Sequence, residues 1–180
     1  MNTLKLKLLA ASMFACSAAF AQNAPASMRP TITDPNAPNP TPAYNNNRST
    51  YANDSYVLQQ GLNQYAKVDQ SGNGPGNTAD ILQGVNGGGG NNATQTQTSA
   101  GTPGRNTAYI AQDGFTSSAS QTQTGRDNVA DIEQQTGSHN NYAAQIQDGA
   151  GDRALITQSG NTEQAVQKQT GGNSNYANTS

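Results

Sequence analysis

Few side chains in this 180-residue chain are of the types that catalyse reactions or hold metals. His139 is the only histidine, and a zinc site needs three or four His, Cys or carboxylate ligands. Asp131, Glu133, Asp148 and Asp152 could suggest the paired carboxylates of glycoside hydrolysis. Asp131 and Glu133 alternate along one expected strand, however, and are more simply interpreted as outward-facing, solubilising charges. We therefore expect no enzyme activity, no metal and no cofactor.

A far more regular polar pattern consists of amides. Aligned on the unit Ala-x-(Ile/Val/Gln)-x-Gln-x-Gly, the chain repeats from Ser55 onward, with starts 11, 13, 14, 15, 11, 11, 13, 11 and 11 residues apart. A glutamine follows every start by four residues: Gln59, Gln70, Gln83, Gln97, Gln112, Gln123, Gln134, Gln147, Gln158 and Gln169. The marked residues alternate, which is the period of a β-strand. Each unit thus predicts a strand of about five or six residues, with the length variation confined to turns.

Three other residue types keep fixed places in the unit. Asparagine often precedes the start by two residues: Asn53, Asn77, Asn91, Asn106, Asn128 and Asn141. The third position is aliphatic in every other unit, with glutamine between from the third strand onward, which predicts an apolar core of Val57, Val68, Ile81, Ile110, Ile132 and Ile156. Glycine follows most of the glutamines and predicts turns at Gly61, Gly72, Gly114, Gly125, Gly149, Gly160 and Gly171.

The alternation of two unit types makes a pair of strands the true repeat. We expect an all-β fold, a β-solenoid of about five stacked strand-turn-strand coils with two strands each, at about 53–76, 77–105, 106–127, 128–151 and 152–174. Asn175-Tyr176-Ala177 resembles the opening of a sixth coil. A buried, unpaired amide costs about 1–3 kcal/mol. With coils about 4.8 Å apart, each glutamine could instead bond to its equivalents above and below.

The segments before and after the repeat have a different composition. Residues 1–21 combine two lysines with an apolar run and a small-residue cleavage site before Gln22, which predicts a signal peptide and an exported protein. Residues 22–52 are rich in Pro and Asn and predict a disordered leader. The repeat region is expected over 53–177 and a short tail over 178–180.

The overall composition narrows the possible partners. Only 32% of the residues are hydrophobic and 11% are charged, with a net charge of −2. The chain has too few apolar residues to form an ordinary hydrophobic core. Its net charge is too small for charge-driven disorder. We expect no nucleic acid partner and no membrane insertion. Weakly charged, amide-rich strands can instead pair with identical strands, so the expected partner is the protein itself.

The repeat unit resembles that of a known protein family. The pattern Asn-x-Ala-x-Ile-x-Gln-x-Gly-x-x-Asn-x-Ala-x-x-x-Gln is similar to the curlin repeat of bacterial curli fibre subunits, and residues 106–114 and 128–134 match it closely. The resemblance implies a subunit, major or minor, of functional amyloid fibres (curli, a class of pilus) on the cell surface, with a role in biofilm and cell adhesion. It also implies a nucleator subunit and an outer-membrane secretion pore as partners.

Two other classes of β-solenoid share some features with this sequence. Thr94, Thr96 and Thr98 suggest a carbohydrate- or ice-binding face, which would be non-enzymatic, but such a face needs threonine at the same place in every coil. Other coils carry Lys67 and Asp69 there instead. A polysaccharide-lyase type of β-helix would need a longer chain and a charged catalytic cluster on one face.

Overall fold

The computed structural model describes residues 53–72, 76–100 and 104–180, which form eleven strands in two sheets. One sheet, here the odd sheet, contains β1 (Asp54–Gln59), β3 (Thr78–Gln83), β5 (Thr107–Gln112), β7 (Val129–Gln134), β9 (Arg153–Gln158) and β11 (Tyr176–Thr179). The other, the even sheet, contains β2 (Tyr65–Gly72), β4 (Asn92–Ser99), β6 (Ser118–Arg126), β8 (Tyr142–Ala150) and β10 (Gln164–Asn173). The expected signal peptide and leader lie outside the described residues.

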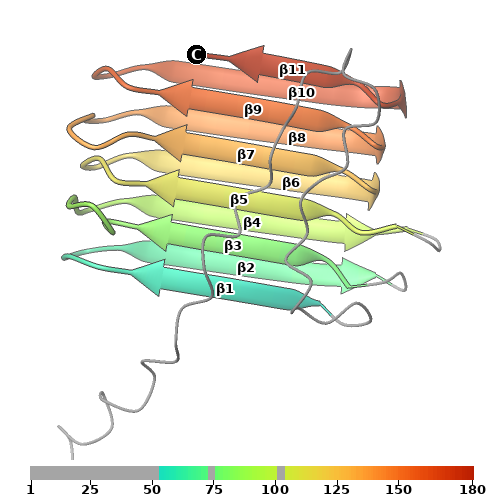
Figure 1. Ribbon diagram of the computed structural model, residues 1–180, viewed down its shortest axis with the longest axis horizontal. Helices are drawn as coiled ribbons and strands as arrows, with labels where there is room; N and C mark the ends of the chain where they lie inside the picture. The colour runs from blue at the N-terminus through green and yellow to red at the C-terminus, as the bar shows by residue number, and fades with distance from the viewer. Residues whose placement is uncertain (1–52, 73–75, 101–103) are drawn as a thin grey trace, which may run out of the picture.

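The chain passes from one sheet to the other at every turn, so each odd strand and the following even strand form one coil. Within each sheet, neighbouring strands are parallel and in register, and equivalent repeat residues are Cα partners, as in Ile81↔Ile110 and Gln95↔Gln121. Figure 1 shows the two layers, with the odd strands running in one direction and the even strands in the other. The all-β fold and the β-solenoid of about five coils are therefore confirmed.

A narrow hydrophobic core lies between the two sheets. In it, an isoleucine column of the odd sheet packs against an alanine column of the even sheet. The isoleucines are Ile81, Ile110, Ile132 and Ile156, and the alanines are Ala93, Ala119, Ala143 and Ala165. Alanine lets the sheets approach closely, because a methyl group fills little of the gap. Val68 packs against this cluster, but Val57 is 43% exposed. Its assignment to the core is corrected: β1 lies at the end of the odd sheet, where β3 is its only neighbour among the described strands.

The strands of the two sheets differ in length. The strands β1 to β9 of the odd sheet have six residues each, as expected, whereas the even strands have eight to ten. The even strands are longer because pairing continues through the glycine position, as in Gly125↔Gly149. The expected turn glycines thus divide: Gly61, Gly114 and Gly160 lie in turns, and Gly72, Gly125, Gly149 and Gly171 lie near the ends of even strands.

A residue in the turn before each of these even strands adopts a left-handed backbone conformation. The φ angle is +58° at Asn63, +70° at Gly90, +53° at Thr116 and +58° at Asn140. Each of these residues directly precedes the polar residue that lies two positions before the start of a unit. Threonine is β-branched and is rarely found at positive φ. The repeated geometry of the stack therefore overrides local preference at Thr116.

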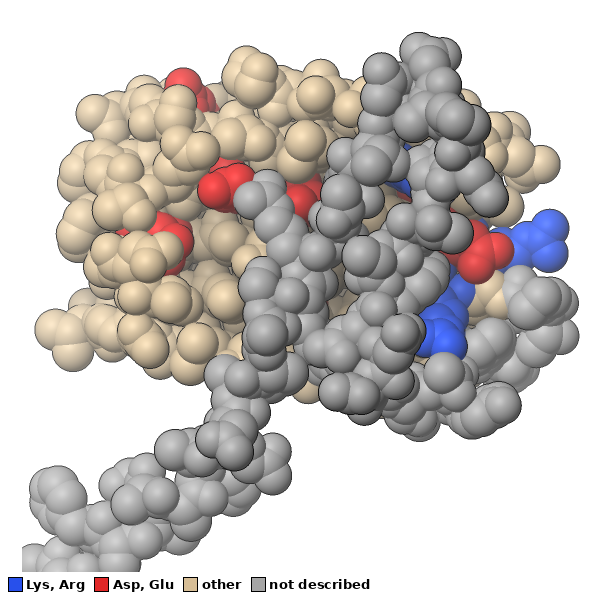
Figure 2. Space-filling view, in the orientation of Figure 1, with Lys and Arg blue, Asp and Glu red and all other residues tan. Residues whose placement is uncertain are grey.

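Charged side chains are scattered over the surface. On the face in Figure 2, acidic residues form separate spots among uncharged atoms, with basic side chains towards one side. Among residues 53–72, 76–100 and 104–180, no group of three or more His, Cys, Asp and Glu could hold a metal ion. The same residues include no helix long and apolar enough to cross a membrane.

Candidate functional site

The structure joins all ten glutamines at the fifth position of the units into two hydrogen-bonded ladders. In the odd sheet, Gln59, Gln83, Gln112 and Gln134 each donate from Nε2 to Oε1 of the next glutamine, ending at Gln158, over 2.8 Å. In the even sheet, Gln70, Gln97, Gln123 and Gln147 do the same, ending at Gln169, over 2.8–2.9 Å. The ladders follow the stack axis, so they bind coil to coil.

A third ladder runs through the third position of the even sheet. Gln95 donates to Gln121 and Gln121 to Gln145 over 3.0 Å, and Gln145 donates to Gln167 over 3.2 Å. At the β2 end of this ladder, the register partner of Gln95 is Val68, which has no amide to donate. As a result, no described residue forms a hydrogen bond with the buried Gln95 Oε1. The odd sheet has isoleucine at this position, so the two sheets fill the core by different means.

Every ladder glutamine after Gln59 also donates an amide N–H across the core. Gln121 donates to the carbonyl oxygen of Tyr109 over 2.8 Å, and Gln83 donates to that of Tyr65 over 2.9 Å. A glutamine amide thus bonds along the stack and to the opposite sheet at once. These side chains hold the coils in register and the two sheets together, and a buried network of this kind is favourable because its donors are satisfied.

The asparagines of the repeat form a different kind of column. In one column, Asn77 N–H donates to Asn53 Oδ1 over 2.9 Å, and the relay continues through Asn106, Asn128, Asp152 and Asn175. In a second column, it passes through Gln64, Asn91, Ser117, Asn141 and Glu163. The bond in both columns thus runs from a backbone N–H to a side-chain oxygen. The sequence pattern did not single out Gln64, Ser117 and Glu163, although each lies two residues before the start of a unit, as the asparagines do.

The stack has two end faces that differ in chemistry. At the β1/β2 end, Gln59 and Gln70 donate to the next coil, but nothing in the described part of the chain donates to their Oε1 atoms. At the β10/β11 end, Gln158 and Gln169 accept from below, and each donates only to a backbone carbonyl, of Tyr142 and Arg153. One face therefore presents amide acceptors and the other presents amide donors.

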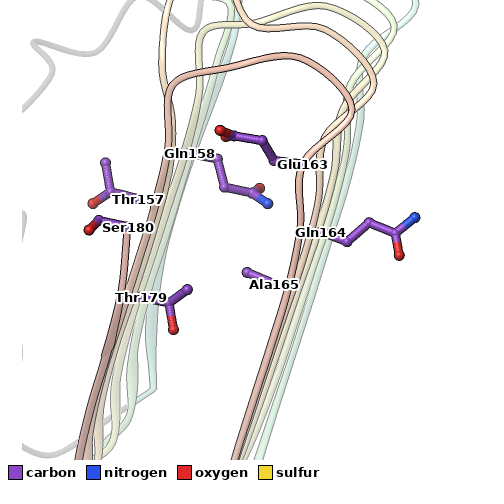
Figure 3. A pocket seen from close by; sticks show the side chains of 7 residues that line it. All are labelled: Thr157, Gln158, Glu163, Gln164, Ala165, Thr179 and Ser180. Carbon is purple, nitrogen blue, oxygen red and sulfur yellow. The ribbon is translucent and has the colours of Figure 1, made fainter.

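A pocket opens on the β10/β11 face. β11 pairs with only the first four residues of β9, Arg153–Ile156, and leaves Thr157 and Gln158 uncovered. In Figure 3, Gln158, Glu163 and Ala165 lie between the two rows of strands, and Gln164 points away from them. Glu163 Oε2 is buried there, and none of the described residues forms a hydrogen bond with it. The pocket is thus an unfilled place in the core, lined by groups that can still form hydrogen bonds.

The residues first considered for catalysis do not converge. Asp131 and Glu133 lie on the outer side of the odd sheet, and Asp148 lies on the outer side of the even sheet. Asp131 is only 1% exposed, so its interpretation as a solvated charge is corrected. Its register neighbours along the stack are the bulky Tyr109 and Leu155. Glu133 is half-buried.

Turn residues also stack along one edge. His139 packs on Phe115 with ring centroids 5.1 Å apart and nearly parallel planes. Backbone bridges continue this row from Gly89 to Asn161. The contact explains His139 as a stacking residue of a turn.

The threonines of the even sheet form a short array only. Thr96 pairs with Thr122 and Thr98 with Thr124, across β4 and β6. In β8, the register partner of Thr122 is Ile146. The array therefore covers two coils, as the sequence indicated.

The chain matches no protein-family model, and it shows no significant similarity to a curated protein or to a solved structure.

Proposed function

We propose that this protein is a structural subunit that self-assembles into extracellular, curli-like amyloid fibres for biofilm matrix, adhesion and aggregation. The observation that carries the proposal is the pair of end faces, where the two glutamine ladders of the fifth position stop with amide donors on one side and acceptors on the other. A second copy supplies the missing partners.

Edge strands support the same proposal. β1 and β2 lie at one edge of their sheets, and β10 and β11 lie at the other. An edge strand presents backbone N–H and C=O groups that can pair with a strand of another chain. Val57 on one face and Val166 beside the other are 43% and 66% exposed, and stacking of a further coil reduces that exposure.

The family resemblance supplies the remainder of the proposal. By that resemblance, a nucleator subunit starts fibre growth, and an outer-membrane pore exports the chain. Among the described residues, the amide ladders are the feature on which a nucleator of the same repeat would act, because its own ladders would continue them.

The proposal is tested on the purified chain beginning at Gln22, the expected mature form. We expect thioflavin-positive fibres whose lag is abolished by preformed seeds, with diffraction reflections near about 4.7 and 10 Å. A chain that stays monomeric with seeds present would contradict self-assembly.

A matched pair of variants locates the assembling surface. Val57→Lys places a charge on the β1/β2 face, whereas Ile146→Lys makes the same change on the outer side of β8, a strand with a neighbour on each side, at a side chain that is 38% exposed. We expect Val57→Lys to slow seeded elongation at least about tenfold, because a charge buried without a partner is strongly disfavoured. Ile146→Lys should elongate at the normal rate, and equal slowing of both variants would argue against end-to-end growth.

A further inference from the structure

Each kind of side-chain hydrogen bond in the stack keeps a single direction along the stack axis. Every ladder glutamine donates its amide towards the coil that follows in sequence, as Gln123 does to Gln147. The backbone N–H of each asparagine-column residue donates towards the coil that precedes it, as Asn106 does to Asn77. Both directions repeat from coil to coil, so they are a property of the whole stack and make its two end faces complementary to each other.

A joint between two identical faces conflicts with this direction. Such a joint requires a two-fold axis perpendicular to the stack, since the same patch must meet itself. That axis would make the paired strands antiparallel, whereas every pairing among the described strands is parallel. It would also place the amide donors of Gln158 and Gln169 against one another. Only a head-to-tail joint continues the ladders.

The number of strands determines how the second copy is turned. Among the described strands, the odd sheet has one strand more than the even sheet, because β11 covers β9 and none of them covers β10. A second copy added without rotation would put its β1 on β11. Its β2 would then lie two strand spacings from β10, with an unpaired row of backbone groups between them. A half-turn about the stack axis exchanges the two sheets and keeps all strands parallel.

We propose that successive copies join head to tail with a half-turn, so that β1 of the incoming copy pairs with β10 and its β2 pairs with β11. This inference rests on the proposed fibre function and specifies the joint. The partner is a second copy of this chain, and the surface is the β10/β11 face.

The side chains at this joint match when the register of the stack is continued. Gln59 lies on Gln169 and accepts its remaining amide N–H. Val57 lies on Gln167, whose Nε2 already donates to Leu155 O and Thr179 Oγ1 over 2.8 Å, so an apolar neighbour leaves no donor unmatched. Tyr56 covers the exposed Val166.

Disulfide trapping distinguishes the possible joints. The chain from Gln22 has no cysteine, so single-cysteine variants can be made at outward positions without disturbing the core. Tyr56→Cys is mixed with either Val166→Cys or Asn178→Cys, assembled into fibres and oxidised. Equivalent residues on adjacent strands lie about 4.8 Å apart, which suits a disulfide. We expect covalent dimers from Tyr56→Cys with Val166→Cys, at least about tenfold more than from Tyr56→Cys with Asn178→Cys.

Each other result overturns the proposal in a defined way. Dimers from Tyr56→Cys with Asn178→Cys would show stacking without rotation, and dimers from any single variant alone would show joints between identical faces. Fibres that give no dimers in either mixture would also reject this joint. Leu58→Cys with Lys168→Cys provides a second pair if Tyr56→Cys fails to fold. Absence of fibres from the unmodified chain would instead reject the proposed function, so the two failures are distinguishable.

Discussion

The two sheets solve the same packing problem with different side chains. At the third position of each unit, the odd sheet stacks isoleucine and the even sheet stacks glutamine. The isoleucine column needs only apolar neighbours. The glutamine column needs every member, because each amide satisfies the next and also reaches a carbonyl of the opposite sheet. The apolar column therefore gives cohesion, and the amide column gives register.

The largest expected effect comes from a leucine placed in each column. Gln121→Leu removes a hydrogen-bond partner from three groups: the Gln95 amide N–H, the Gln145 side-chain oxygen and the Tyr109 carbonyl oxygen. At about 1–3 kcal/mol for each unsatisfied group, the free energy of unfolding should fall by at least about 3 kcal/mol. The midpoint of guanidinium unfolding, followed by circular dichroism on freshly prepared soluble chain, measures the loss.

The matched control for that change is Ile132→Leu in the odd sheet. A volume-conserving apolar swap should cost less than about 1.5 kcal/mol. If both leucine variants lost the same stability, the distinction between the two columns would be wrong.

We expect an intermediate loss of stability when a glycine that lies within an even strand is replaced. A Cβ on Gly125 would clash with the backbone oxygen of Gly149, whereas a Cβ on Gly137, in a turn, would meet nothing. Both residues have positive φ, so alanine costs about 1–2 kcal/mol at either position. Gly125→Ala should lose about 1–3 kcal/mol more through overpacking. Thermal unfolding of the two variants side by side tests this, and a milder Gly125→Ala would contradict the close stacking.

The smallest expected effect is a gain. Val68→Gln would supply a donor to the unpartnered Gln95 Oε1 and should stabilise the fold by about 1 kcal/mol. The same change in the odd sheet, Val57→Gln, sets an amide beside Ile81 and should give no gain. A higher denaturant midpoint for Val57→Gln than for Val68→Gln would reverse the comparison of the sheets.

The fold could be predicted from the sequence because period-two alternation and a repeated glutamine determine which side chains face each other. Ile110 and Gln112 both carry that signal. The direction of the amide bonds carries no such signal, since a glutamine can donate either way. The backbone-to-side-chain bonds at Asn77 and the positive φ at Thr116 likewise depend on the stacked geometry.

The errors in the sequence-based predictions arose where a residue's neighbours differ from those of its equivalents. Val57 has the pattern of a core residue but lies on an end strand. Asp131 has the pattern of a surface residue but lies between Tyr109 and Leu155 along the stack. A repeat pattern describes an average coil, so the end strands and the outer faces need the three-dimensional arrangement.

The common direction of the glutamine ladders has an electrical consequence. An amide group carries a dipole on the order of 3.5 D, and in this stack the amides of three ladders point the same way along the axis. Their axial components add, and a rotation about the axis leaves those components unchanged. A fibre of such subunits would be a rod with a permanent electric moment that grows with its length, and an applied field would align it with a sense set by the direction of the chain.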